Sequence, residues 1–192
     1  MRLADEVHKA INNKQFTLFV MIDLEKAFDF VWHKGLLCNM KQVGLRSNMF
    51  KFVEVFLKDR SIQVRLGAAC SAHTSWNGRP QGSVPSPLLF IIMISDLPES
   101  SNDVKLALSA DFSSMWKSSQ SLSALSRDIQ RYIAERAKFS EEWGFKISIN
   151  KAVEILFSRS KHIPTDEVIL KINDVTIKLF EKTVKFLGVI FD

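Results

Sequence analysis

The sequence predicts an α+β fold in which a mostly antiparallel sheet is backed by helices. Short apolar runs rich in β-branched and aromatic residues are typical of strands, and longer segments with helical periodicity lie between them. The two kinds of segment follow one another in irregular order, without the regular alternation of a parallel sheet. Two strand-like runs near the end of the chain are separated only by Asn173 and Asp174, which predicts a tight hairpin.

A strand and a helix are predicted near the start of the chain. Phe16–Ile22 is almost continuously apolar, which favours a buried strand that ends at Asp23. A helical pattern follows from Glu25 to Val43. Gly44 is suited to end this helix, because glycine readily adopts the left-handed conformation that commonly follows a helix.

The middle of the chain predicts two further helices with a strand between them. Ser47–Lys58 has one apolar face and is expected to be helical. Ser61–Leu66 alternates polar and apolar residues, which indicates a half-buried strand. A very apolar helix is expected from Ser86 to Leu97, with Ser86 as its cap and Pro87 in its first position. Because this helix is apolar on nearly all sides, we expect it to be buried.

The second half predicts the remaining strands and the longest helix. Val104–Ala110 is strand-like, with Met115 and Trp116 in its hairpin partner. The longest helix is expected over Ser121–Trp143. Its apolar stripe consists of Leu122, Leu125, Ile129, Tyr132, Ile133 and Phe139. Further strands are expected at Val153–Phe157, Val168–Ile172, Val175–Ile177 and Val184–Phe191.

Composition and charge limit the classes of function. The 192 residues, 46% of them hydrophobic, suffice for one domain with a sizeable core. A net charge of +5 favours polyanionic partners. Cys38 and Cys70 form no closely spaced pair, which argues against a zinc site and against a disulfide framework. The absence of a disulfide framework favours an intracellular compartment, either the cytoplasm or the nucleus. The sequence shows no secretory signal and no apolar run long enough to span a bilayer.

Two aspartates are candidates for metal chemistry. Asp23 ends one strand-like run and Asp111 ends another. Carboxylates at the ends of adjacent strands can converge on Mg²⁺, a hard ion that prefers oxygen ligands. Two such ions can activate an attacking hydroxyl group and stabilise a leaving oxygen. The alternative is that each aspartate only forms a turn or caps a helix, and taken singly each residue favours that alternative.

Five segments, taken in order, decide between these interpretations. They are Asp23–Asp29 (DLEKAFD), Pro80–Phe90 (PQGSVPSPLLF), Leu108–Phe112 (LSADF), Trp143–Lys151 (WGFKISINK) with Ile155–Ser158 (ILFS), and Val184–Asp192 (VKFLGVIFD). Their order and spacing resemble the palm motifs of reverse transcriptases, specifically those of non-LTR retrotransposons of the jockey and LINE kind. The resemblance covers almost the whole chain, and its second and fifth segments are the most specific.

This resemblance implies a fold, an activity and a set of partners. The expected fold is a polymerase palm with incomplete fingers and no thumb, and residues 1–192 would form this partial palm domain. The expected activity is RNA-directed DNA synthesis, in which a deoxynucleotide is transferred to a primer end by two metal ions. Its cofactor would be Mg²⁺, with Mn²⁺ as an alternative. Its partners would be an RNA template, a DNA primer and deoxynucleoside triphosphates, without a membrane.

The resemblance also implies roles for individual residues. Asp23 and Asp111 would be the catalytic residues that hold the metal ions. Four further residues are expected to contact the nucleotide. Phe28 would lie under its sugar, and Lys151 would lie near its triphosphate. Gln81 and Gly82 would line the nucleotide and template pocket. An ordinary structural role remains the alternative for each of these four residues: a core aromatic, a turn, or a solvated lysine.

The sequence departs from the family pattern at the third motif. Phe112 stands where the family has its second aspartate, and Ser109 replaces its tyrosine. Because phenylalanine cannot ligate a cation, we expect this copy to be impaired, and a chain without fingers and thumb would hold a primer and template poorly. The alternatives are a non-catalytic nucleic-acid-binding remnant of a retroelement, and a fragment that folds poorly and has no molecular function.

Overall fold

A computed structural model of the chain describes most of its residues. The described ranges are 2–25, 31–72, 74–75, 82–97, 104–109, 112–159, 168–177, 184–186 and 189–191. Contacts divide the chain into two compact units. The first, here called the sheet unit, comprises Met1–Glu25, Pro98–Ser140 and Ile147–Asp192, and the second, the helical unit, comprises Lys26–Leu97 and Glu141–Lys146.

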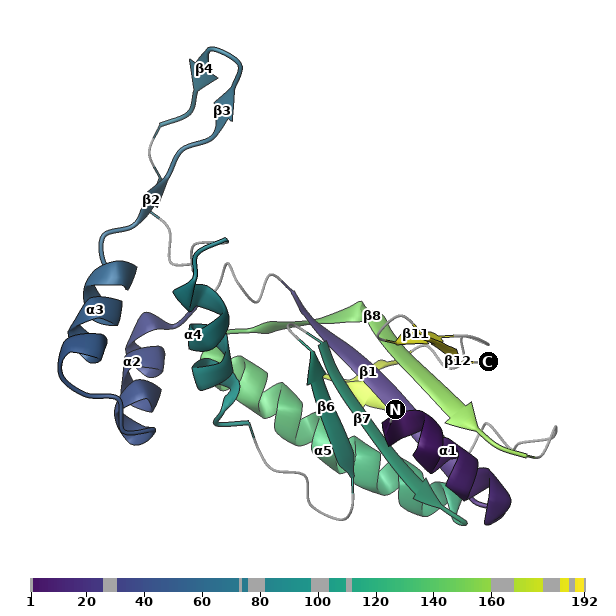
Figure 1. Ribbon diagram of the computed structural model, residues 1–192. Coiled ribbons are helices and arrows are strands. Elements are labelled where there is room, and N and C mark those ends of the chain that lie inside the picture. Colours follow the sequence, from purple (N-terminus) through teal and green to yellow (C-terminus); the bar gives the residue numbers. More distant parts are fainter. Residues whose placement is uncertain are drawn as a thin grey trace. The chain divides into compact units, whose positions relative to one another are not determined.

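The sheet unit is built on a four-stranded sheet with the strand order β6-β7-β1-β8 (Figure 1). The strands are β1 (Phe16–Glu25), β6 (Lys105–Ser109), β7 (Phe112–Ser119) and β8 (Lys146–Phe157). The central pair, β1 and β7, is antiparallel, and its register runs from Phe16 opposite Ser119 to Asp23 opposite Phe112. Strands β6 and β7 are also antiparallel, with Leu106 opposite Met115. The predicted α+β class with its mostly antiparallel sheet is therefore confirmed.

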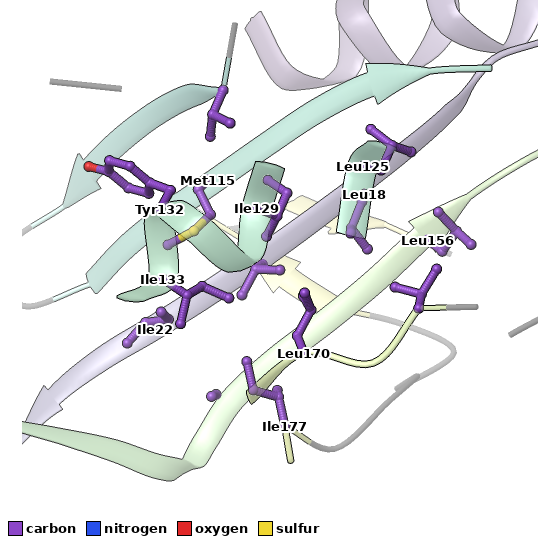
Figure 2. Packing of buried hydrophobic residues seen from close by; sticks show 14 of the residues in the cluster. Leu18, Ile22, Met115, Leu125, Ile129, Tyr132, Ile133, Leu156, Leu170 and Ile177 are labelled. Carbon is purple, nitrogen blue, oxygen red and sulfur yellow. The ribbon is translucent and has the colours of Figure 1, made fainter. Parts of the chain in front are cut away.

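One face of the sheet is covered by the long helix α5 (Leu122–Trp143). Alternate residues of β1, such as Leu18 and Ile22, point to this face and pack against the helix. Figure 2 shows Leu125, Ile129 and Ile133 of α5 gathered with these strand residues. Every residue of the stripe predicted for this helix is buried. We call this side the α5 face.

The opposite face, the α1 face, is covered in part by helix α1 (Arg2–Asn12). Leu3 and Val7 of the helix pack with Phe19 of β1 and Trp116 of β7. The indole Nε1 of Trp116 also donates a hydrogen bond of 2.7 Å to Glu6 of the helix. This helix was not predicted, although the spacing of its buried residues, three and four apart, is a helical signal.

Strand β1 is longer than predicted, and the following helix is shorter. The strand continues to Glu25, where the helix was expected to begin, whereas α2 spans only His33–Gln42. The predicted end of that helix is confirmed, since Gly44 has a φ of +83° and donates its N–H to the carbonyl of Lys41 at 3.1 Å. Leu45 donates to Met40 at 2.9 Å, which completes a Schellman motif.

Helix α2 contacts two other helices of the helical unit, α3 (Asn48–Leu57) and α4 (Pro85–Ile94). Helix α3 matches its prediction and buries Val53 and Leu57. Helix α4 begins one residue before the predicted cap Ser86, because Val84 and Pro85 already have helical backbone geometry. The expectation that α4 is buried on all sides is wrong.

An exposed stripe explains that error. Leu88 and Ile91 are 57% and 60% exposed, whereas Leu89 and Met93 on the other side of α4 are buried. Periodicity cannot reveal this, because an all-apolar helix has no polar face to indicate which side lacks a covering element.

The predicted half-buried strand Ser61–Leu66 is also wrong in its burial. It is divided into β2 (Ser61–Ile62) and β3 (Arg65–Leu66), which pair with β5 (Thr74–Ser75) and β4 (Ala69–Cys70) to form an extended hairpin (Figure 1). Residues 61–72 are all exposed. Alternation specifies which side chains share a face of a strand, but it does not supply an element to cover that face.

Near the end of the chain, the predicted tight hairpin is confirmed. Strands β9 (Lys171–Ile172) and β10 (Val175–Thr176) are antiparallel, and both turn residues have positive φ, 47° at Asn173 and 64° at Asp174. The strand predicted over Val184–Phe191 is instead a pair, β11 (Val184–Phe186) and β12 (Val189–Phe191).

Both cysteines are free, and no helix among the described residues is long and apolar enough to cross a membrane.

Candidate active site

Asp23 lies near the end of β1, on the α1 face. Its side chain follows Phe19 and Met21 on that side of the strand, because residues two apart point the same way. Only 1% of Asp23 is exposed. A carboxylate so buried, at the end of an otherwise apolar strand, needs a cationic partner to offset its desolvation.

Lys151 of β8 is that partner. Its Nζ lies 2.7 Å from Oδ2 of Asp23, so two residues that are 128 positions apart form an ion pair. The lysine side chain is 68% exposed. Within the described part of the chain, Oδ1 of Asp23 has no hydrogen-bond partner. One carboxylate oxygen is thus held by a solvent-accessible lysine, and the other lacks a protein donor.

The second predicted ligand, Asp111, lies outside the described residues. It immediately precedes Phe112, whose backbone is opposite Asp23 in the register of β1 and β7. The backbone register therefore relates Asp23 to the residue that follows Asp111 in the sequence. In the described ranges no group of three or more histidine, cysteine, aspartate or glutamate side chains could hold a metal ion.

The donor chemistry of Asp23 nevertheless fits a hard divalent cation. A carboxylate oxygen is the ligand type that Mg²⁺ and Mn²⁺ prefer. The buried Oδ1 atom, which has no donor among the described residues, is available for such a contact.

The predicted nucleotide contacts are distributed over both units. Phe28 and Gln81 lie outside the described residues. Gly82 belongs to the helical unit, is exposed and has a φ of +83°, a conformation that favours glycine. Lys151 is the nucleotide-contact candidate that the structure brings together with a predicted metal ligand.

One buried acid was missed. Glu154 of β8 is fully buried, and neither carboxylate oxygen has a hydrogen-bond partner in the parts of the chain that are described. Burial raises the pKa of this carboxyl group to about 7. It lies between Ala152 and Leu156, which belong to the core of the α5 face, so alternation directs it away from Asp23. A glutamate inside the apolar run from Ala152 to Phe157 was the sequence signal.

Comparison with known proteins identifies the family. A family model described as "Reverse transcriptase (RNA-dependent DNA polymerase)" matches residues 1–191. The chain belongs to the reverse transcriptase family. The resemblance that the five segments indicated is therefore confirmed.

Curated relatives agree with this family. The RNA-directed DNA polymerase from mobile element jockey of Drosophila melanogaster is 29% identical over 165 residues, covering 82% of this chain and 18% of that protein. The probable RNA-directed DNA polymerase from transposon X-element of the same species is 27% identical over 196 residues, covering 100% of the chain and 21% of that protein. The chain thus spans about a fifth of the length of these relatives.

A solved structure supports the fold. Apo telomerase from Candida tropicalis, truncated from its C-terminal domain, matches 84% of this chain and 36% of its own, with a TM-score of 0.59 and 14% sequence identity. At this identity the likeness concerns the fold alone, and it supports the predicted polymerase palm.

Proposed function

We propose that this chain, as a palm domain over residues 1–192, takes part in RNA-directed DNA synthesis. The observation that carries the proposal is the carboxylate of Asp23, which is buried at the end of β1 with Oδ1 lacking a donor among the described residues. An acid at this position in a member of the reverse transcriptase family is best explained as a ligand for a catalytic cation.

The chain's own residues would bind and orient the reactants. Asp23 and Asp111 would hold Mg²⁺ or Mn²⁺, and these ions, when bound, would lower the barrier by stabilising charge on the attacking and leaving oxygens. Phe28 would contact the sugar of the incoming nucleotide. Gln81 and Gly82 would line the nucleotide and template pocket, where the absence of a side chain at Gly82 permits close approach.

Lys151 would act as an exchangeable partner of Asp23. Its ion pair offsets the buried negative charge when no cation is bound. Because the lysine is largely exposed, its ammonium group can reach a triphosphate once a bound cation neutralises Asp23 in its place. In this proposal the lysine changes from neutralising the metal ligand to binding the substrate.

Phe112 would limit the activity of this copy. Loss of even a residue that supports a metal ligand typically lowers activity or metal affinity by about 10–100-fold. We therefore propose that the chain retains the ancestral site with reduced metal affinity. Its template and primer would be RNA and DNA, in keeping with the names of its relatives.

Primer extension on an RNA template with Mg²⁺ or Mn²⁺ tests the proposal. Asp23→Asn should lower extension by at least about 100-fold, because it removes the charge of a ligand while keeping its shape. Phe112→Asp should raise extension by at least about 10-fold. Asp174→Asn is the matched control, since it removes a carboxylate from an exposed turn that asparagine also tolerates. Equal extension by the parent chain and Asp23→Asn would refute the proposal.

A specific observation favours non-catalytic nucleic-acid binding as a second candidate. Residues 33–70 contain seven lysine or arginine residues and two acidic ones, a net charge of +5 that equals that of the whole chain. Binding through these residues would weaken steeply with salt, because each neutralised phosphate releases a counterion. Salt-sensitive binding of an RNA–DNA duplex that is equal in the parent and Asp23→Asn, without extension by either, would favour this candidate.

A further inference from the structure

A concave site lies at the end of β1 opposite Asp23. It has a volume of about 470 Å³ and is lined by Lys14, Gln15, Phe16, Ser158 and Arg159. The first three residues lead into β1, and the last two follow β8, its neighbour in the sheet. The site therefore belongs entirely to the sheet unit. Its volume falls within the range of about 300–1,000 Å³ that is typical of small-molecule sites.

This pocket is remote from Asp23. Asp23 lies seven positions further along β1 than Phe16, which is about 23 Å at the rise of a strand. One nucleotide cannot bridge that distance. A ligand in this pocket would therefore be distinct from a nucleotide held at the candidate active site.

Lys14 has a backbone conformation that is unusual for its type. It follows α1 with a φ of +55° and donates its N–H to the carbonyl of Ile11 at 3.2 Å. Gln15 donates to Ala10 at 2.8 Å, so the helix ends in a Schellman motif. Glycine is the usual residue at this position, and a residue with a side chain costs about 1 kcal/mol there. A lysine at this position places a cation at the pocket at some cost in stability.

The lining has the chemistry of a phosphate site. Lys14 supplies a compact positive charge, and Arg159 supplies a planar fork that can bind two phosphate oxygens at once. Gln15 and Ser158 bring side-chain groups that can donate hydrogen bonds. The half-buried ring of Phe16 offers an apolar wall of the kind on which bases stack. Among the described residues, no acidic side chain lines the pocket.

We propose that this pocket binds a phosphate group of a nucleotide or of a nucleic-acid strand. The proposal does not depend on the catalytic role of Asp23. It gives the palm sheet a second anion-binding site at the end opposite the candidate active site. A free nucleotide and a nucleic-acid strand present the same chemistry, a phosphate next to a base that can stack. They differ in that a strand continues beyond the pocket.

Fluorescence anisotropy with a labelled twelve-nucleotide DNA strand, at several salt concentrations, tests the proposal. The test variant is Lys14→Gly with Arg159→Gln. Glycine suits the positive φ of residue 14, so this change removes the charge without straining the helix end. We expect its affinity to fall at least about 10-fold and its salt slope to fall by about one for each phosphate contact that is lost.

A charge-matched control separates the pocket from general electrostatics. Lys146→Gln with Lys171→Gln removes two exposed charges outside the pocket and outside residues 33–70, and should weaken binding less than about 3-fold. Lys14→Arg with Arg159→Lys should retain binding. If Lys14 served only the dipole of α1, Lys14→Gly with Arg159→Gln would bind the strand as tightly as the charge-matched control, and the proposal would be overturned.

Competition distinguishes the two sources. Displacement of the strand by a deoxynucleoside triphosphate or by inorganic pyrophosphate, lost in Lys14→Gly with Arg159→Gln, would assign the pocket to a free nucleotide. Failure of both competitors, together with the loss of strand binding in that variant, would assign it to a strand backbone. Binding of strand and competitors that is unchanged in the variant would refute the site even if Asp23→Asn abolished primer extension.

Discussion

The two faces of the sheet each carry an ion pair between an aspartate and a lysine, and the pairs differ in burial rather than in length. On the α5 face, Nζ of Lys117 lies 2.8 Å from Oδ2 of Asp128, and the side chains are 14% and 9% exposed. On the α1 face, Lys151 lies 2.7 Å from Asp23, and the side chains are 68% and 1% exposed. In the first pair both partners are enclosed, whereas in the second the lysine is open to solvent.

This difference indicates what each pair does. The α5 face is closed by a helix, and the enclosed pair of Lys117 and Asp128 joins β7 to α5. On the α1 face, Leu3 and Val7 cover the sheet beside Phe19 and Trp116, whereas the side chain of Lys151 is open to solvent, where a ligand could reach it. The similar distances of 2.8 and 2.7 Å therefore conceal a structural pair and a pair that we propose to be exchangeable.

The largest effect is expected from Glu154, which tests how completely the α5 face is closed. Its pKa is about 7 in the folded chain against an ordinary value of 4.5, so the folded state keeps a proton that the unfolded state releases. Stability should therefore fall as pH rises from 4.5 to 7, by roughly 3 kcal/mol in total. Glu154→Gln, which cannot ionise, should be more stable than the parent by up to that amount at about pH 8 and little different at about pH 4.5.

Urea denaturation at both pH values measures this effect. Glu141→Gln, a change at an exposed position, is the control and should show no such pH dependence. A stability difference for Glu154→Gln that is the same at both pH values would mean that Glu154 has a partner in the folded chain.

An intermediate effect is expected from the enclosed pair. Lys117→Met leaves the buried Asp128 without its nearest partner and should cost about 2 kcal/mol, because Arg127 and Arg131 at 3.6 and 4.0 Å still offset part of the charge. The hydrogen bond from Lys117 is the main cause that lowers the pKa of Asp128 below 3.8. The stability from this group is thus present above pH 3.8 and is lost as pH falls through the folded pKa.

Denaturation at neutral pH and at about pH 3 would measure this cost. We expect the difference between Lys117→Met and the parent to shrink at the lower pH. A difference that persists unchanged would assign the cost to lost packing of the lysine stem rather than to charge.

The smallest effect is expected from the exchangeable pair. Lys151→Met should cost less than Lys117→Met, about 1 kcal/mol, because Lys151 is 68% exposed and solvent screens its attraction to the Asp23 carboxylate. Thermal melts of Lys151→Met and Lys117→Met side by side give the comparison. A cost for Lys151→Met equal to that for Lys117→Met would show that the two pairs are equivalent and would remove the basis for calling Lys151 exchangeable.

Local patterns were sufficient for those elements that have one polar and one apolar side, or a defined turn. The stripe of α5, the strand that begins at Phe16 and the turn at Asn173 and Asp174 were all predicted, because periodicity and turn chemistry act over a few residues. The predictions of burial were wrong where burial depends on whether another element covers the segment. The hairpin that begins at Ser61 alternates like a half-buried strand, yet residues 61–72 are exposed.

The candidate site shows the same division. Asp23 was predicted from the strand that it ends and from the motif in which it lies. Its ion pair with Lys151 was not predicted, since the lysine was expected near a triphosphate rather than against the carboxylate. Glu154 was missed although it interrupts an apolar run, because only the packed core reveals that no donor among the described residues reaches it.

By itself, the sequence determined the family, the α+β class and the position of Asp23 at the end of a buried strand, because these depend on residue types at short and regular spacing. Only the tertiary structure decided which face of the sheet is closed, which side of α4 stays exposed, and which of 26 basic residues reaches Asp23. The physical reason is sequence separation: Lys151 and Asp23 are 128 positions apart, and only the pairing of distant strands brings their charges to 2.7 Å.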